Sequence, residues 1–400
     1  MRQEGEKITF VQRMNGFFSK PIFSDYRVLF GLWMILSVVS CFCKLGHGRH
    51  NNYLIFKYVF WHAFKGTSLY AHYPQEFSDC NHYGPFFSMI IAPFAILPDW
   101  LGILLWLTVM TAGLYYAVRK LSVAKRVHIF IYWFCAHELL TALFMQQFNI
   151  ATAAMIVATF YCIEKEKDGW AAFWIMLGTF VKLYGIVGLA FFFFSKHKKK
   201  FIMYLILWAA VMFVAPMIIS SPDYILSQYG EWYQSLTLKN AINSDLHGGT
   251  NISLIGMFHR ISGDASFSDL YLIVPGLILF FAPYFRFNQY KHSAFRLTLL
   301  ASVLLFVILF STGSESSGYI ISFVGVVIWY TVAPWKRTGW EIFLLIFVFV
   351  LSSLSPSDLF PAYLRKNFVQ PYALKALPCA IVWFQLIYEM CRRDYAPSSK

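Results

Sequence analysis

The feature of this sequence that most constrains its fold is the recurrence of short Lys and Arg clusters between long apolar runs. The clusters are Arg119-Lys120 with Lys125-Arg126, Lys196–Lys200, Lys336-Arg337 and Arg392-Arg393. Membrane proteins retain such clusters on the cytoplasmic side of the bilayer. Each cluster therefore marks a point where the chain returns to the same side, and the pattern predicts a topology.

The composition excludes an ordinary soluble protein. Of the 400 residues, 58% are apolar, 20% are aromatic and only 13% are charged, which is too little charge to cover a water-exposed surface. The net charge of +13 needs no nucleic-acid partner, because positive residues kept in the cytoplasm account for it. The seven Cys show no metal or redox spacing, and no nucleotide-binding motif is present. We therefore expect no cofactor, no disulfide framework, and any activated donor to arrive through the membrane.

The apolar runs predict an all-α polytopic membrane protein with about twelve transmembrane helices. A helix needs about 20 apolar residues to cross the ~30 Å hydrocarbon core, and some of these runs only just suffice. We expect both chain ends in the cytoplasm, because most Lys and Arg then lie on that side. The expected helices lie near residues 28–45, 99–118, 128–144, 150–164, 170–181, 183–196, 200–220, 269–284, 295–311, 318–334, 340–353 and 376–391.

A single membrane domain is expected over residues 28–391. It lies between a cytoplasmic segment (1–27) that is not a cleavable signal and a cytoplasmic tail (392–400). The first external loop is expected to carry an interfacial helix over 52–64, and the Pro-rich piece 84–97 is expected to be re-entrant or interfacial. The large external loops are 46–83, 221–268 and 354–375.

Two basic residues are candidates for holding a phosphate. Residues 170–196 are too short for two full membrane helices unless both are broken near Lys182, and such a break is tolerated only where it lines a cavity or packs in protein. A lysine at this depth usually has a functional partner, and it could hold a lipid phosphate as a point charge. Arg260 could grip a phosphate through two hydrogen bonds. The alternatives are a Lys182 that snorkels to the interface and an ordinary interfacial Arg260.

Three carboxylates on the predicted external face are candidates for a catalytic base: Glu76, Asp79 and Glu315. A carboxylate at the water–lipid boundary can take a proton from an attacking sugar hydroxyl. It can also hold a divalent cation, although two neighbouring carboxylates are too few to predict one. The competing interpretation makes Glu76 and Asp79 a solvated capping pair and places Glu315 in a plain connector between helices.

Other polar residues leave their roles open. Gln147 and Asn149 form an external turn that binds a sugar or merely caps two helices. His247 opens a Gly-rich loop whose backbone can approach a ligand closely. His137 and Glu138 lie about two turns deeper, where an acid marks either a site or a structural pair between helices.

Four segments, in their order and their shared side, resemble glycosyltransferase family 87, a family of polytopic enzymes in the GT-C superfamily. The resemblance covers roughly residues 28–335. Each segment alone is too short to indicate the family, so the resemblance rests on their common order and shared side. The segments are Asn52–Tyr70, Tyr83-Gly84-Pro85 with Pro93 and Pro98, Gln147-Phe148-Asn149 with Lys182, and Asn251-Ile252-Ser253-Leu254 with Arg260.

This resemblance implies a GT-C-like fold and an inverting hexosyltransferase. Such an enzyme moves one sugar, typically mannose, from a polyprenyl-phosphate donor to a lipid-linked or envelope glycan acceptor, on the outer face of a bacterial cytoplasmic membrane. Lys182 and Arg260 would bind the donor phosphate, and one of the three candidate carboxylates would be the base. The implied substrate-binding residues are Asn52, Tyr83, Gln147, Asn149, His247, Asn251, Ser253 and Tyr319.

Two departures from the family pattern keep other functions open. Asn52 stands where the family has the Asp expected to be the base, and an amide takes no proton at neutral pH. Ser317 and Gly318 stand where many members have a His pair. Either the base has moved, or the protein is a lipid-linked-glycan flippase, or it is a catalytically silent protein that binds polyprenyl glycans. The sequence leaves the sugar, the acceptor and the linkage undetermined.

Overall fold

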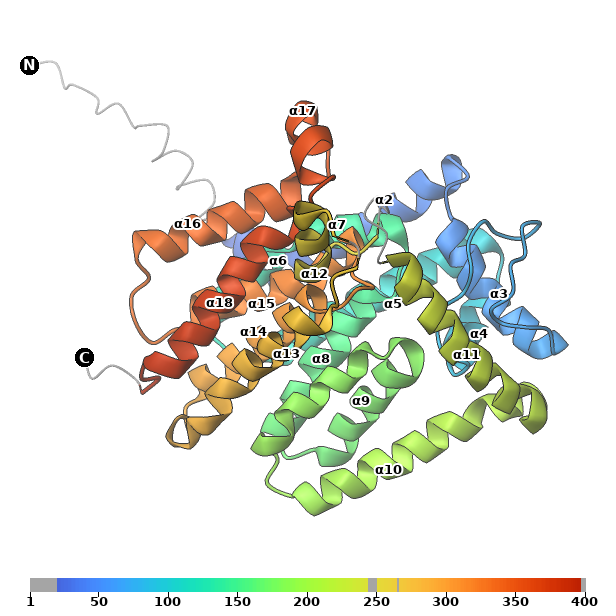
Figure 1. Ribbon diagram of the computed structural model, residues 1–400, viewed down its shortest axis with the longest axis horizontal. Coiled ribbons are helices and arrows are strands. Elements are labelled where there is room, and N and C mark those ends of the chain that lie inside the picture. Colours follow the sequence, from blue (N-terminus) through green and yellow to red (C-terminus); the bar gives the residue numbers. More distant parts are fainter. Residues whose placement is uncertain (1–19, 244–249, 265, 397–400) are drawn as a thin grey trace, which may run out of the picture.

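The computed structural model describes residues 20–243, 250–264 and 266–396, and every regular element in these ranges is helical (Figure 1). The first half of the chain forms η1 (Pro21–Ser24), α2 (Tyr26–Gly46), α3 (Asn51–Lys65), α4 (Phe87–Ala95), α5 (Asp99–Lys120), α6 (Lys125–Phe134), α7 (Ala136–Met145), α8 (Asn149–Glu164), α9 (Asp168–Lys182) and η2 (Tyr184–Phe194). The second half forms α10 (Lys198–Val214), η3 (Ala215–Ile218), α11 (Pro222–Asn243), α12 (Leu254–Ser262), α13 (Leu270–Phe281), η4 (Ala282–Phe285), η5 (Phe287–Gln289), α14 (Ser293–Leu309), η6 (Ser316–Gly318), α15 (Tyr319–Val332), α16 (Gly339–Phe347), η7 (Val348–Leu354), α17 (Ala362–Leu364), η8 (Arg365–Val369) and α18 (Ala376–Arg392).

The predicted all-α membrane fold agrees with these elements, since each predicted apolar run contains a helix. In the described residues, three helices are long and apolar enough to cross a bilayer: α2, α5, and α10 continued by η3. The pair α6 and α7, bent by 48° at its break, makes a fourth if it is one span. Several other apolar helices are shorter than 18 residues, so the number of twelve spans stays a prediction.

The centre of the bundle is the antiparallel pair α14 and α15, which α6, α8 and α18 cover. Every residue of α15 from Tyr319 to Trp329 is buried. Gly325 makes the close packing possible, because a Cβ at this position would lie 2.9 Å from the carbonyl oxygen of Ala301. By contrast α10 exposes Ile206 and other large apolar side chains, as expected of a helix that faces lipid.

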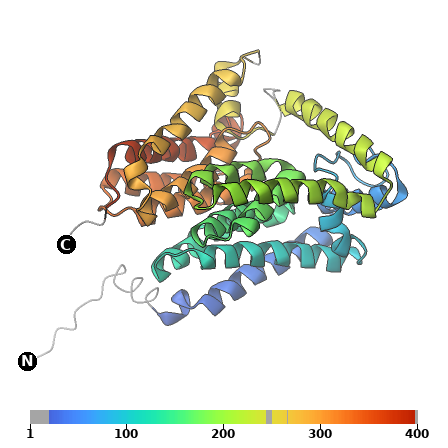
Figure 2. The same ribbon diagram turned by 90° about the horizontal axis from the view of Figure 1, so that it is seen from below.

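The two ends of the bundle differ in character. At one end, where α2 begins and α18 finishes (Figure 2), basic residues join segments that the sequence places in the cytoplasm. Arg296 makes two hydrogen bonds, of 2.6 and 2.8 Å, to the Glu164 carboxylate, and Arg337 lies 2.8 Å from Glu389. The helices α3, α4 and α11 lie at the opposite end (Figure 2), and this end carries the polar loops.

The break that the sequence predicts near Lys182 is confirmed. Helix α9 finishes at Lys182, and Leu183 takes a left-handed conformation with φ of 54° before the 3₁₀ helix η2 begins. The two helices pack as a hairpin, because a Cβ on Gly185 would come within 2.5 Å of the Gly178 carbonyl carbon. Lys182 therefore lies at the tip of a helical hairpin, where its side chain can reach the polar end of the bundle.

Gly84 fixes the loop between α3 and α4 against this hairpin. Its amide donates a 3.0 Å hydrogen bond to the Val181 carbonyl, and a Cβ at Gly84 would lie 2.2 Å from the Phe180 carbonyl oxygen and 2.9 Å from the Trp232 ring. Any larger residue must therefore push the loop away from the end of α9.

We predict that Gly84→Ala lowers the thermal unfolding midpoint, with a destabilisation of about 1–3 kcal/mol typical of overpacking. Gly230→Ala is the matched control, because Gly230 lies within α11 and a Cβ there meets nothing within 4 Å. That control should be as stable as the wild type or more so. Equal midpoints for the two variants, measured in the same detergent, would contradict the close contact.

Candidate functional site

A polar cavity of about 320 Å³ lies at the end of the bundle that carries loops predicted to be external. Its walls come from segments that are far apart in the sequence: α3 and the first loop, the turn before α8, the tip of the α9–η2 hairpin, α11, and the turn between α14 and α15. The charged and polar side chains that line it include Asn52, Asp79, His82, Gln147, Lys182, Lys239, Asn240 and Glu315. Both signs of charge therefore face one cavity.

Lys182 is held in place by an amide and two aromatic rings. Its Nζ donates a 3.0 Å hydrogen bond to Asn149 Oδ1. The same Nζ lies 5.7 Å from the ring centroid of Tyr83 and 5.0 Å from that of Tyr184, which is the range of cation–π attraction. These contacts keep the positive charge at the cavity wall.

Glu315 belongs to the same hydrogen-bond network. Its Oε2 accepts a 2.6 Å hydrogen bond from Gln147 Nε2. Gln147 Oε1 in turn accepts from Asn149 Nδ2 at 2.9 Å and from Ser317 Oγ at 2.9 Å. The two amides thus present oxygen towards Lys182 and nitrogen towards Glu315. They link the opposite charges without a direct ion pair, so that both charged groups keep bonding capacity for a ligand.

Asp79 and Asn52 also line the cavity, where they add a carboxylate and an amide to its wall. Asp79 is exposed, and its Oδ1 accepts a 2.8 Å hydrogen bond from the Cys80 amide. Asn52, at the start of α3, donates from Nδ2 to the Met145 carbonyl at 2.8 Å. Asn52 lines the cavity, with its amide group turned partly to the backbone, and its role in substrate binding stays a prediction.

The structure separates Glu76 from this cavity. Glu76 Oε2 lies 2.7 Å from Nε2 of His62 on α3, and neither residue lines the cavity. In the described part of the chain, no group of three His, Cys, Asp or Glu side chains could hold a metal ion.

Arg260 also lies apart from Lys182. Its guanidinium donates to the carbonyl of Gln370, at 3.1 Å, and to that of Thr250, and it does not line the cavity. These bonds tie α12 to the third external loop. The two basic candidates therefore do not share one wall, and the external placement of Arg260 stays a prediction.

The Asn251–Ser253 segment, expected to bind substrate, makes local contacts that cap α12. Ser253 Oγ accepts from the Gly256 amide at 3.0 Å and donates to Asn251 Oδ1 at 2.6 Å. Tyr319 OH donates to the Ile252 carbonyl at 2.9 Å. None of these side chains lines the polar cavity, and His247 lies outside the described residues.

Several lining residues had no assigned role in the sequence. Tyr184 lies two residues after Lys182, so the predicted break was the signal that pointed to it. His82 stands beside Asp79 in the first loop. Lys239 and Asn240 lie on α11, a stretch without a motif, and only the folded chain brings them to the cavity.

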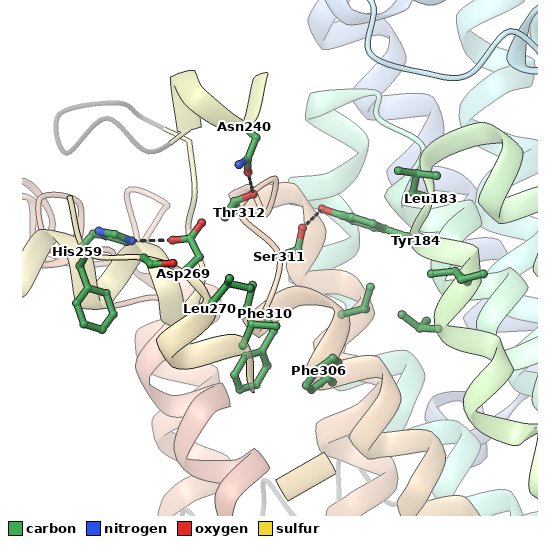
Figure 3. Close-up of a pocket in the computed structure, with 16 residues that line it drawn as sticks. Leu183, Tyr184, Asn240, His259, Asp269, Leu270, Phe306, Phe310, Ser311 and Thr312 are labelled. Atoms are coloured by element: carbon green, nitrogen blue, oxygen red, sulfur yellow. Dashed lines mark hydrogen bonds and ion pairs between the residues drawn. The ribbon is translucent and has the colours of Figure 1, made fainter. Parts of the chain in front are cut away.

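A second cavity, of about 680 Å³, adjoins the polar one (Figure 3). The two share Leu183, Tyr184, Asn240, Ser311 and Thr312. At this boundary Tyr184 OH lies 2.9 Å from Ser311 Oγ, and Thr312 Oγ1 donates to Asn240 Oδ1 at 2.5 Å. Beyond the boundary one wall of the second cavity is apolar and includes Ile186, Val187, Ile273, Phe306 and Phe310. Another wall carries His259 and Asp269, whose Nε2 and Oδ1 lie 2.8 Å apart (Figure 3). The polar cavity thus opens beside a cavity that has both an apolar and a polar wall.

Comparison with known families identifies one match. The model of glycosyltransferase family 87 matches residues 81–312, which is more than half of the chain. The matched region begins just after Asp79 and reaches the turn that carries Glu315, so it includes most of the cavity wall. No curated protein matches the chain.

The cavity keeps His82 neutral. Burial, together with the positive charges of Lys239 and Lys182, lowers the pKa of His82 to about 4 against the opposing effect of Asp79. Its Nδ1 lies 2.8 Å from Ser235 Oγ, a contact that a neutral ring can make. In the unfolded chain this ring titrates near pH 6.5.

From this shift we predict a loss of stability in mild acid. Between pH 6.5 and pH 4 the unfolded chain takes up a proton that the folded His82 does not, so the contribution to stability is full above pH 6.5 and declines as the pH falls. His82→Gln should therefore show a smaller drop in unfolding midpoint between pH 7 and pH 5 than the wild type. Parallel pH profiles for the two proteins would contradict this assignment.

Proposed function

The chain belongs to glycosyltransferase family 87, and on that premise we propose that it moves a single sugar from a polyprenyl-phosphate donor to a lipid-linked or envelope glycan acceptor. Mannose is the sugar to test first. The proposal places a GT-C-like domain in a bacterial cytoplasmic membrane, with the reaction on the external face. It requires no cofactor.

The observation that carries this proposal is the junction of the polar cavity with a second cavity that has one apolar wall. A polyprenyl-phosphate sugar has an apolar chain, a phosphate and a polar sugar in that order. The apolar wall of the second cavity suits the first isoprene units, and Lys182, beside the boundary formed by Tyr184 and Ser311, suits the phosphate. The remaining polar space is then available to the sugar and the acceptor hydroxyl.

The proposed step is a direct displacement. A carboxylate takes the proton of the acceptor hydroxyl, and the hydroxyl oxygen forms a bond to the anomeric carbon from the face opposite the phosphate. The bond between the anomeric carbon and the phosphate oxygen breaks, and its electron pair leaves with the polyprenyl phosphate. Lys182 stabilises the charge that develops on that phosphate. One displacement inverts the anomeric centre.

We assign the base to Glu315 or Asp79, because both line the cavity. Glu76, an earlier candidate from the sequence alone, is paired with His62 outside the lining residues. For the second cation we propose Lys239, which lines the cavity, in place of Arg260, whose guanidinium contacts two backbone carbonyls.

The external placement of the site rests on the charge pattern. The cavity is lined by parts of two of the three loops that the sequence places outside, together with turns assigned to the same side. Basic clusters gather at the opposite end, as in the contact of Arg296 with Glu164. The positive-inside rule then supports an external site with both chain ends in the cytoplasm.

The proposal predicts that the purified protein in nanodiscs transfers label from radiolabelled polyprenyl-phosphate mannose to a glycolipid in a total lipid extract of its host. No label should move from GDP-mannose in a parallel reaction, since the described residues and the sequence carry no nucleotide motif. Transfer from the nucleotide sugar would contradict the proposed donor. Carrier binding without transfer, after glucose and galactose carriers have also been supplied, would favour a silent binding protein.

A second prediction identifies the base. Glu315→Gln or Asp79→Asn should lower kcat by roughly 10²–10⁴-fold, the contribution typical of a general base, with little change in thermal midpoint. Glu76→Gln is the matched control, because its carboxylate contacts His62 instead of the cavity. It should keep turnover within a few-fold of the wild type. If both cavity variants retain full turnover, the mechanism is wrong.

A further inference from the structure

A buried ion pair lies behind the cavity wall. Glu138 is on α7, just after the bend that follows α6, and Lys375 immediately precedes α18. Lys375 Nζ lies 3.1 and 3.0 Å from the two carboxylate oxygens of Glu138. The two side chains are only 3% and 0% exposed, and neither lines the polar cavity.

The lysine of this pair also holds the turn that carries Glu315. Nζ of Lys375 lies 3.0 Å from both the carbonyl oxygen and the hydroxyl of Ser316. The neighbours of Ser316 in sequence, Glu315 and Ser317, are the residues that bond to Gln147. A continuous set of contacts therefore runs from the buried pair to the acidic wall of the cavity.

The same lysine stabilises a second feature of the turn. Its Nζ lies 4.8 Å from the ring centroid of Tyr319, whose hydroxyl donates to the Ile252 carbonyl at 2.9 Å. The Ile252 amide donates a 2.6 Å hydrogen bond to the carbonyl oxygen of Ser314. Lys375 thus contacts Ser316, the first residue of η6, and Tyr319, the first residue of α15.

Stability alone gives a weak reason for such a pair. Removing two charges from water is costly, and well-packed apolar residues of similar size often replace a buried pair at no loss of stability. What apolar residues cannot supply is a donor for the Ser316 carbonyl and hydroxyl. The geometric role of the pair is therefore to fix the position of Ser316.

We propose that Glu138 and Lys375 are positioning residues that hold Ser316, and through it the Glu315 carboxylate, in the orientation required for sugar transfer. Glu138 orients and neutralises the ammonium group, and Lys375 anchors the turn. This inference rests on the proposed function for its catalytic consequence, whereas its structural consequence, an ordered turn over residues 311–318, can be measured without activity.

The test is the double variant Glu138→Leu/Lys375→Met, which replaces both charges together so that neither is left buried alone. Three quantities are measured in nanodiscs: the thermal midpoint, the amide hydrogen exchange of residues 311–318, and kcat with the donor KM. The matched control is Arg337→Met/Glu389→Leu, which removes another buried pair, 2.8 Å apart, at the basic end of the bundle.

We expect the Glu138/Lys375 variant to unfold within a few degrees of the control variant. Its amides in residues 311–318 should exchange roughly tenfold faster, and its kcat should fall at least about tenfold while the donor KM changes little. The control should keep wild-type exchange in this turn and wild-type kcat. A folded Glu138/Lys375 variant with unchanged exchange and unchanged kcat would overturn the proposal.

If the double variant does not fold, the Ser316→Ala variant tests the proposal instead. It keeps the ion pair and removes the contact between Lys375 Nζ and the Ser316 hydroxyl. It should speed exchange in residues 311–318 and lower kcat, and wild-type values for both would overturn the proposal. If the wild type transfers no sugar from any carrier, the proposed function fails. The exchange data then still determine whether the pair orders the turn.

Discussion

The site depends on how the charge of Lys182 is held at the tip of a broken helix. The left-handed Leu183 turns the chain back after α9, and the ammonium group is left at the cavity wall on a partly buried side chain, where an unpartnered charge is costly. Asn149 partners it at 3.0 Å. Because Asn149 bonds to Gln147, and Gln147 to Glu315, the position of the cation determines the orientation of the acid.

Two amides standing between the charges have a chemical consequence. A direct contact between Lys182 and Glu315 would neutralise both groups and leave little for a substrate. With Gln147 and Asn149 between them, the charges stabilise one another through aligned dipoles and still face the cavity. Such an arrangement suits a reaction that needs a base at one place and an anion-binding cation at another. In this arrangement the Asn149 side chain orients the Lys182 ammonium group, and the Gln147 side chain orients the Glu315 carboxylate.

Much of the fold could be predicted from the apolar runs and the charge pattern of the sequence, whereas the site could be predicted only in part. The apolar runs correctly located the helices, and the short stretch around Lys182 correctly indicated a break that lines a cavity. Local sequence could not distinguish Glu76 from Asp79, although only Asp79 lines the cavity. The reason is that the partner of Glu76 is His62, on a helix 14 residues earlier, whose orientation depends on packing.

The sequence by itself determined that this chain is helical and apolar, where its helices lie and which polar segments share a side, because these properties depend on local hydrophobicity and on the cost of moving charge across a bilayer. Only the tertiary structure decided which polar residues meet. Lys239 reaches the cavity from α11, and Lys375 reaches Glu138 across 237 residues of chain. Contacts of this kind depend on helix packing, which has no local signal in the sequence.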